Sequence, residues 1–386
     1  MIDLDANATT PLLPEVFDAM LPWLRGVHAN PSGSYSAAKL ARHAIDQARE
    51  QVAQLIGAHP EEIVFNGGGT ESLNTALHSL DCLTKSGAAV VSAIEHSAVL
   101  RYVEKLGRAT VLVGVDAGGR LDMADLTKSL EGAAFVSVMT ANNETGVIQP
   151  VREVAELARE RGLPVHTDAV QAAGKIKLDV REMGVDLLSL SAHKFHGPKG
   201  VGVLYVRNGL KFEPLLRGGG QEGGRRSGTE NTAGIVGMGA AAACASRYLS
   251  ENGDSKVREL RDAFESQVLA GIPGVTVNGD VTCRLPNTSH LSFDQCAAAG
   301  LLILLDEAGI SCSAGSACMT GKQRPSHVQL AMGIPETRAK SSLRFAFSRI
   351  NTMDDARSAA GTLKKVVDKL RSVQGPGVGP VVVYTQ

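Results

Sequence analysis

The sequence has few aromatic residues, no closely spaced cysteine pair and no long apolar run. Aromatic side chains make up 4% of the 386 residues, while 44% are hydrophobic and 20% charged, a composition typical of a soluble globular protein. No cysteines form a C-x-x-C pair, which argues against both a zinc ribbon and a secreted disulfide framework. We therefore expect a reducing compartment, the cytoplasm, for a chain whose cysteines are Cys82, Cys244, Cys283, Cys296, Cys312 and Cys318.

An excess of charge of either sign is also absent. The 39 basic and 40 acidic residues give a formal net charge of -1, which provides no electrostatic footprint for nucleic acid. No apolar stretch approaches the length of a membrane span. The first residues, MIDLDANATT, lack the basic and apolar regions of a signal peptide. We expect no membrane attachment and no direct contact with nucleic acid.

The chain is long enough for two hydrophobic cores. Between about residues 37 and 245, amphipathic stretches alternate with short apolar runs, which predicts βα units and a mostly parallel sheet covered on both faces. A polar stretch follows Tyr248, and the pattern beyond it is α+β. We predict an α/β fold with a large domain of residues 13–248 and a smaller domain of residues 1–12 and 249–386. One helix of the large domain should end at Gly57 and bury Leu40, Ala44, Ala48, Val52 and Leu55.

Ligands of open α/β sheets lie at the carboxyl ends of strands, so polar residues at those positions are candidates for a site. In FNGGGTES, a predicted strand leads through Gly67–Gly69 to Thr70 at the start of a helix. Glycines let backbone N–H groups approach an anion, and the helix start adds positive potential. The segment indicates a phosphate cradle, although a plain glycine turn capped by Thr70 is equally compatible.

Two further strand ends carry a carboxylate and an amine. In VHTDAVQ, Asp168 precedes Gln171 and could pair with a protonated ring nitrogen, or it could simply cap a helix. In SLSAHKFHGPKG, Lys194 could form a Schiff base, or it could be a solvated surface lysine. His193 and His196 have metal-ligand spacing, but no third ligand stands nearby, so we predict no metal site.

Two polar segments complete the set. Asn142, Asn143 and Glu144 follow a predicted strand and could orient a bound ring, or they could form only a turn. Arg344 lies in the strand-like run SSLRFAFSR, where its guanidinium could grip a carboxylate or form a structural ion pair. A phosphate cradle, a carboxylate for a ring nitrogen, a Schiff-base lysine and a carboxylate clamp together are the parts of a pyridoxal-phosphate site.

The segments that carry these residues also carry a family resemblance. The chain resembles the cysteine desulfurases, class V enzymes of the fold-type I (aspartate aminotransferase-like) pyridoxal-phosphate transferases. The resemblance runs nearly end to end, and SAHKFHGPKG together with GSAC is highly specific. The GSAC form on a long loop matches the class that supplies iron–sulfur assembly and tRNA thiolation. The other matching segments are LDANATTP, HANPSGS, GGGTES, EHSAVL, NNETGVIQ, HTDAVQ, GGGQEGGRRSGT and SSLRFAFSR.

The resemblance implies a role for each matching residue. Lys194 would hold pyridoxal phosphate and abstract the α-proton, while Asp168 would pair with the ring nitrogen. His96 would stack on the ring and take part in catalysis, and Arg344 with Asn143 would bind the substrate carboxylate. The remaining cofactor contacts would come from Gly69, Thr70, Asn143, Gln171, Ser191 and His193, and from Thr229 of a partner subunit in a homodimer.

Cys318 lies in a run dominated by glycine, serine and alanine, SCSAGSACMTG, with few large apolar neighbours to bury it. The resemblance makes this thiol the nucleophile, which takes sulfur from L-cysteine, releases alanine and carries a persulfide to a protein acceptor. The acceptor could be a cluster scaffold or a thiolation enzyme, serving iron–sulfur clusters, tRNA thiolation or DNA phosphorothioation. Cys312 lacks the GSAC context and is expected to be structural.

Two other interpretations remain open at the level of the residues. One is another enzyme of the same fold, an aminotransferase or a selenocysteine lyase. The other is a non-catalytic scaffold that retains the fold and binds a sulfur acceptor. Transamination needs no mobile thiol, and the presence of Lys194, Asp168 and Cys318 together argues against a scaffold, so we favour the cysteine desulfurase.

Overall fold

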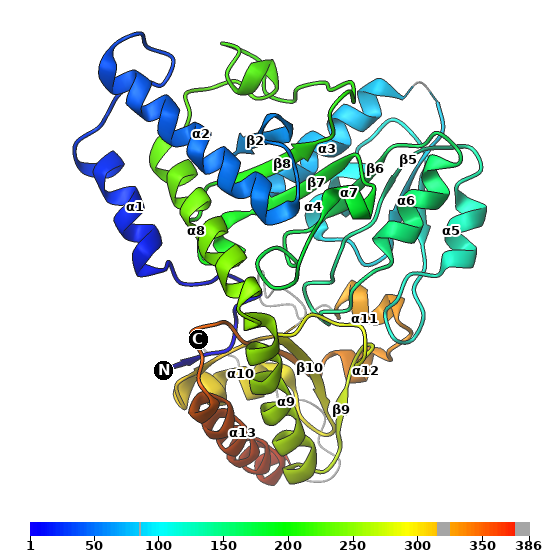
Figure 1. The fold of residues 1–386 in the computed structure, drawn as a ribbon. Helices are drawn as coiled ribbons and strands as arrows, with labels where there is room; N and C mark the ends of the chain where they lie inside the picture. Colours follow the sequence, from blue (N-terminus) through cyan, green and yellow to red (C-terminus); the bar gives the residue numbers. More distant parts are fainter. Residues whose placement is uncertain (85, 315–324, 375–386) are drawn as a thin grey trace, which may run out of the picture.

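The computed structural model describes residues 1–84, 86–314 and 325–374 (Figure 1). A sheet of seven strands lies at its centre, in the order β2-β8-β7-β6-β5-β3-β4. β8 is antiparallel to both of its neighbours, and the other adjacent pairs are parallel, as the βα pattern predicts. The strands are β2 (Ile63–Asn66), β3 (Ala88–Ser92), β4 (Thr110–Val113), β5 (Ala133–Ser137), β6 (Val165–Asp168), β7 (Leu187–Ser191) and β8 (Gly202–Val206).

Helices cover both faces of this sheet. Alternate strand residues point to opposite faces: Val203 packs with the core on the α2 and α8 side, and Leu204 packs with the core on the α3 and α4 side. Burial on both faces explains why the strands read as continuous apolar runs. The helices of this part are α1 (Pro14–Arg25), α2 (Ser36–Ile56), α3 (Gly69–Leu83), α4 (Ser97–Val103), α5 (Met123–Ser129), α6 (Val151–Arg159), α7 (Val180–Met183) and α8 (Thr232–Ser250), with short 3-10 turns η1 (Pro60–Glu62), η2 (Ala192–Lys194) and η3 (Glu222–Gly224).

A second sheet, antiparallel and in the order β12-β13-β10-β9, packs with three helices around its own core. Phe264, Phe345 and Phe347 meet in this core, with ring centroids 4.9 and 5.6 Å from that of Phe264. Its elements, with two short helices beside them, are α9 (Gly253–Gly271), β9 (Val275–Val277), β10 (Thr288–Phe293), α10 (Ala298–Glu307), β12 (Ser313–Ala314), α11 (His327–Ala331), α12 (Glu336–Ala339), β13 (Ser342–Ala346) and α13 (Met353–Gln374).

The start of the chain joins this second core. β1 (Ile2–Asp3) pairs in parallel with β11 (Ile310–Ser311), and Leu4 is fully buried among its apolar residues. This arrangement is compatible with the assignment of residues 1–12 to the small domain. The boundary at residue 248 stays a prediction, because α8 continues to Ser250 and α9 begins at Gly253.

One prediction about α2 is wrong. The helix ends before Gly57, which has a φ of 68°, as predicted. Leu40, however, is 52% exposed, and the buried face consists of Ala38, Ala41, Ile45, Ala48, Ala53, Ile56 and their neighbours Val52 and Leu55. The buried stripe passes beside Leu40 rather than through it. None of the helices described is long and apolar enough to cross a membrane.

Candidate active site

A cavity of ≈ 250 Å³ lies at the carboxyl ends of β6 and β7, beside the first turn of α3. This is the edge of the sheet at which polar strand ends were expected to meet. The predicted residues that line it are Gly69, Thr70, His96, Asn143, Asp168, Gln171, Ser191, His193 and Lys194, together with the apolar side chains of Leu73, Met139 and Val170. The structure therefore brings nine of the predicted site residues to one cavity.

The end of the cavity beside α3 has the character of an anion cradle. Gly69 is the first residue of this helix, whose leading N–H groups have no partner within the helix. A Cβ at Gly69 would lie 3.3 Å from Val170 and 3.4 Å from Ser191, so a side chain here would fit tightly and glycine leaves more room in the cavity. Burial lowers the pKa of His193 to about 4, which leaves a neutral imidazole as a hydrogen-bonding group.

Asp168, the last residue of β6, is 5% exposed and faces the cavity. Its Oδ1 accepts a hydrogen bond from the Val170 N–H at 2.9 Å, and within the described chain it forms no ion pair. Turns rather than a helix follow it, so the alternative of a helix cap is wrong. Burial raises the pKa of this carboxyl, while His96 and Lys194 nearby oppose the shift. A buried carboxylate beside an open cavity suits a ligand that carries a protonated nitrogen.

Lys194 ends the short turn η2 that follows β7. Its Nζ donates to the backbone carbonyls of Asn7 at 2.6 Å and Ala8 at 2.8 Å. Burial, and secondly Arg344, lower the pKa of the amine to about 8, against the opposing charges of Asp168 and Asp5. Lys194 is therefore not a solvated surface lysine, and its amine is deprotonated more readily than that of an ordinary lysine.

His96 precedes α4 and enters the cavity from the direction of β3. Its Nδ1 accepts a hydrogen bond from the Ala98 N–H at 3.1 Å. The neutral ring therefore carries its proton on Nε2. Burial lowers the pKa of His96, against the attraction of Asp168, so that this neutral form is favoured near pH 7.

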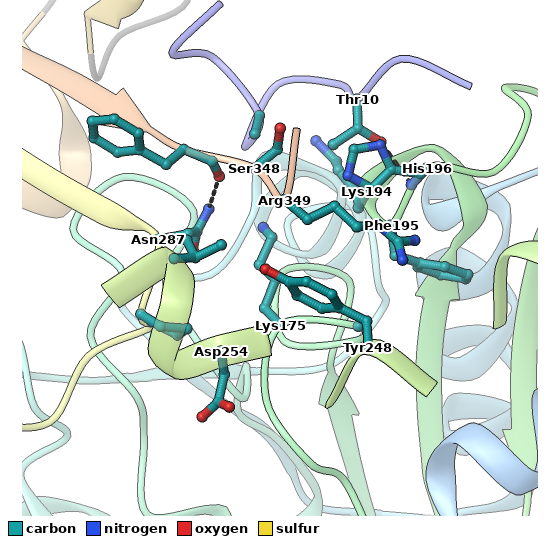
Figure 2. A pocket seen from close by; sticks show the side chains of 15 residues that line it. Thr10, Lys175, Lys194, Phe195, His196, Tyr248, Asp254, Asn287, Ser348 and Arg349 are labelled. Atoms are coloured by element: carbon teal, nitrogen blue, oxygen red, sulfur yellow. Dashed lines mark hydrogen bonds between the residues drawn. The ribbon is translucent and has the colours of Figure 1, made fainter. Parts of the chain in front are cut away.

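A second, smaller cavity of ≈ 40 Å³ lies on another side of Lys194, and Lys175 lines it (Figure 2). The Lys175 amine donates to Asn7 Oδ1 at 2.9 Å and to Gln171 Oε1 at 2.8 Å, while Gln171 Nε2 donates to the Asn7 carbonyl at 2.9 Å. These bonds fix the orientation of the Gln171 amide. Gln171 also lines the larger cavity, and its amide nitrogen has a second N–H beyond the one that Asn7 accepts.

The two asparagines after β5 have different roles. Asn142 Oδ1 accepts from the backbone N–H groups of Glu144 at 2.9 Å and Thr145 at 3.0 Å, so the turn interpretation holds for this residue. Asn143 lines the cavity. Its backbone carbonyl accepts from Arg344 Nη1 at 2.9 Å, which places the clamp residue directly behind the cavity wall.

Arg344, in the middle of β13, does not line the cavity itself. Its side chain is 8% exposed, and Nη2 forms an ion pair with Asp5 Oδ1 at 2.6 Å. The structural ion pair that the sequence left open is therefore present. It does not exclude the clamp, because the same guanidinium also reaches the carbonyl of a cavity residue.

Two further predicted residues are Thr229 and Cys318. Thr229 lines a separate cavity with Asn66 and Arg226, so within one chain it contacts nothing at Lys194. Cys318 lies outside the described residues. Burial raises the pKa of the neighbouring Cys312 thiol to about 12, which makes this residue a poor nucleophile. The described residues contain no cluster that could hold a metal ion, and His196 is instead bonded to the carbonyl of Pro11 at 2.9 Å.

Sequence reasoning missed four polar residues that hold the site. Three are Asp5, Asn7 and Lys175, described above. The fourth, Glu95, is fully buried next to His96, and its Oε1 accepts from Met139 N at 2.6 Å. Asp5 and Asn7 belong to the quoted segment LDANATTP and Glu95 to EHSAVL, so position within a matching motif was the available signal. Glu144, a candidate from the sequence, accepts from Ser326 Oγ at 2.5 Å.

Comparison with known proteins places this site in a family. The class-V aminotransferase family model matches residues 2–358. The cysteine desulfurase IscS of Dictyoglomus turgidum is 43% identical over 376 residues, covering 96% of this chain and 95% of the relative.

Solved structures agree. A NifS-like protein superposes with a TM-score of 0.89 at 34% identity, covering 96% of this chain and 100% of the other. A structure titled SspA in complex with cysteine superposes with a TM-score of 0.79 at 33% identity, covering 91% and 100%. With a fold-type I architecture and an amine, a carboxylate and an anion cradle around one cavity, this chain belongs to the class-V aminotransferase family and, within it, to the cysteine desulfurases.

Proposed function

We propose that this cysteine desulfurase uses pyridoxal phosphate held by Lys194 to transfer the sulfur of L-cysteine to Cys318. The observation that carries the proposal is the buried Asp168 carboxylate, which has no ion-pair partner among the described residues and lines one cavity with Lys194. Pyridoxal phosphate fits this donor set. Its phosphate suits the start of α3 with Thr70 and Ser191, and its protonated ring nitrogen suits Asp168. When bound, the group supplies an electron-accepting ring that stabilises negative charge at the substrate Cα.

Lys194 is the residue for proton transfer at the substrate Cα. An amine with a pKa of about 8 is present partly in its neutral form at pH 7, roughly one molecule in ten, whereas an ordinary lysine has almost none. His96, neutral and protonated on Nε2, lines the same cavity. We propose that it donates a proton to the substrate Cβ after the C–S bond breaks. The Asn143 amide and Arg344 bind the substrate carboxylate.

Cys318 receives the sulfur in this proposal. Its thiolate attacks the sulfur of L-cysteine, and an S–S bond forms as the C–S bond breaks. The electron pair of the C–S bond passes to the substrate Cβ, which takes up a proton, and the products are L-alanine and a Cys318 persulfide. The cysteine complex of the SspA structure supports L-cysteine as the substrate. Cys312, whose buried thiol resists ionisation, is not the acceptor.

The same proposal extends to partners. We infer a homodimer, because Thr229 resembles a phosphate contact made across subunits and lies at a cavity distinct from that of Lys194 in its own chain. A protein acceptor would then collect the persulfide sulfur in the cytoplasm. The acceptor could be a cluster scaffold or a thiolation enzyme.

The decisive experiment is a brief pulse of L-cysteine without reductant, followed by mass spectrometry. One added sulfur should map to the peptide that contains Cys318 and disappear with dithiothreitol. Cys318→Ser should retain the bound cofactor but release essentially no alanine, since serine is a poor nucleophile toward sulfur at neutral pH. Cys312→Ser is the matched control and should behave as wild type. Sulfur on Cys312, or alanine release by Cys318→Ser at the wild-type rate, would contradict the proposal.

A further inference from the structure

The guanidinium that is proposed to bind the substrate carboxylate already binds a carboxylate of its own chain. Arg344 Nη2 contacts Asp5 Oδ1 at 2.6 Å, and Nη1 contacts the Asn143 carbonyl at 2.9 Å. Nε is buried and has no hydrogen-bond partner in the described part of the chain. One edge of the guanidinium is thus occupied by an internal anion of the same chemical class as the substrate's anchoring group.

Asp5 is held so that it can release Arg344 without losing every partner. Its second oxygen, Oδ2, accepts from Ser313 Oγ at 2.8 Å, and its backbone N–H donates to Asp3 Oδ1 at 2.9 Å. The Asp5 side chain is 23% exposed, compared with 8% for Arg344. Water can therefore solvate the carboxylate if the ion pair opens, which keeps the cost of opening moderate.

The balance of charge makes simultaneous binding unfavourable. Among the described residues, Arg344 acts on Lys194 as a like charge, and Asp5 and Asp168 are anions that oppose it there. Lys175, a nearby amine, has a pKa lowered well below its usual range by burial and by the charges of Lys194 and Arg344. A substrate carboxylate added to Arg344 beside Asp5 would place two like charges on one guanidinium, which is destabilising.

We propose that Asp5 is an internal stand-in for the substrate carboxylate, so that binding of the amino-acid substrate exchanges one carboxylate for another on Arg344. The inference rests on the proposed function, in which Arg344 is the clamp. Asp5 is then a positioning residue that occupies the clamp in the free enzyme. Asp5 therefore lowers the affinity of the free enzyme for carboxylate ligands. It also discriminates against ligands whose anionic group binds Arg344 too weakly to displace it.

The test compares two ligands that differ only by the carboxylate. L-alanine and ethylamine are titrated into the holoenzyme, and binding is followed by the absorbance of the cofactor. Asp5→Asn keeps the acceptor oxygen but removes the competing charge, and it should tighten L-alanine binding by about three- to tenfold. Its effect on ethylamine should be less than about twofold. Asp18→Asn, an exposed carboxylate on α1, has the same change in net charge and should alter neither.

Arg344→Gln separates this inference from the proposed function. It should weaken L-alanine binding and abolish the benefit of Asp5→Asn in the double variant. If Arg344→Gln leaves L-alanine binding unchanged, Arg344 is not the carboxylate clamp, and the proposed role of Asp5 is then wrong as well. If Arg344→Gln weakens binding and Asp5→Asn weakens it too, or leaves it unchanged, Asp5 merely orients the arginine and only the present inference is overturned.

Wild-type protein provides a second measurement that does not depend on the folding of a variant. A crystal structure of the holoenzyme with L-alanine should show the ligand carboxylate on Arg344. The Asp5–Arg344 separation should then exceed the ion-pair limit of about 4 Å. An intact Asp5–Arg344 pair beside a bound L-alanine would overturn the exchange.

Discussion

At the scale of the residue, two buried carboxyl groups of this site have opposite surroundings. Asp168 faces the cavity and has cationic or protonatable neighbours, whereas Glu95 faces the interior. Glu95 Oε1 accepts from Ser92 Oγ at 2.7 Å and from the Met139 N–H, and Oε2 has no partner in the described chain. Burial raises the pKa of Glu95 to about 8, so this carboxyl is neutral at pH 7. Burial also raises the pKa of Asp168, but there His96 and Lys194 oppose the shift, so the two carboxyls differ in their cationic neighbours.

Replacing Lys194 tests the residue on which cofactor chemistry depends. Lys194→Ala should lose the visible absorbance of the protein-bound cofactor and lose turnover, because no other amine among the described residues lines the larger cavity. The fold should persist, as judged by circular dichroism. Lys199→Ala, on an exposed neighbour, should retain both properties. A yellow, active Lys194→Ala protein would show that another lysine holds the cofactor.

Replacing Asp168 tests the electronic role of the carboxylate. Asp168→Asn preserves the size of the side chain but removes the charge that keeps the ring nitrogen protonated. Exchange of the substrate α-proton for deuterium, followed by NMR, should slow by orders of magnitude, and more than cofactor affinity falls. Exchange at the wild-type rate would exclude this role.

At the scale of the element, α11 and its cap form three hydrogen bonds with residues near the active-site cavity. Ser326, its cap, donates to Glu144; His327 Nε2 lies 3.0 Å from the Glu95 carbonyl; and Gln329 Oε1 accepts from Ser342 Oγ at 2.9 Å. Each contact is made next to, or two residues from, a predicted site residue. The helix that follows the cysteine-bearing segment in the sequence is thus fixed relative to the cavity.

Ser326→Ala should weaken this attachment. The hydroxyl also accepts from the Val328 N–H at 3.1 Å, so its loss removes a helix cap and takes from the buried Glu144 the donor that it has within the described part of the chain. We expect the free energy of unfolding to fall by about 1–2 kcal/mol in denaturant titrations. Thr127→Ala, on an exposed helical hydroxyl, should change it by less than about 0.5 kcal/mol. Equal effects of the two substitutions would contradict the anchoring role.

The sequence predicted the strands and the residues at their ends more completely than the residues that hold those side chains in place. Strand ends identified Asp168 and Lys194, because parallel strands direct their carboxyl ends to one edge of the sheet. The resemblance added His96, Thr229 and Cys318. No local pattern indicated that Asp5 would pair with Arg344, because that contact joins residues 339 positions apart. This contact depends on the pairing of the N-terminal segment with β13, where Asp5 forms a bridge with Ala346, and hydrophobic periodicity does not encode that pairing.

At the scale of the whole molecule, buried protonated carboxyls link stability to pH. Glu95 has a pKa of about 8 in the folded protein against an ordinary value of 4.5, so the folded state keeps a proton that the unfolded state releases in this range. Its contribution is complete below about pH 4.5 and is lost as the pH rises toward 8. The slope for one such group reaches about 1.4 kcal/mol per pH unit.

Glu95→Gln mimics the protonated form and should flatten this dependence. We expect the free energy of unfolding of wild type to fall more steeply than that of the variant between pH 5 and 8, approximately, when both are measured in denaturant. A residual slope should remain, because burial also raises the pKa of Glu144 to about 7. Parallel curves for the two proteins would show that Glu95 is ionised in the folded state.

The pairing of the first strand with a late part of the chain has a consequence for biosynthesis. Asp5 and Asn7 leave the ribosome early, but Arg344 and the Thr288 hydroxyl that bonds Asn7 are synthesised far later. Contacts of such long range form slowly and only after their distant partner has emerged. A nascent chain can therefore form most of the parallel sheet before Arg344, the proposed carboxylate clamp, has been synthesised. Under the proposed function, a nascent chain that ends before Arg344 lacks the carboxylate clamp, so we expect it to release no sulfur.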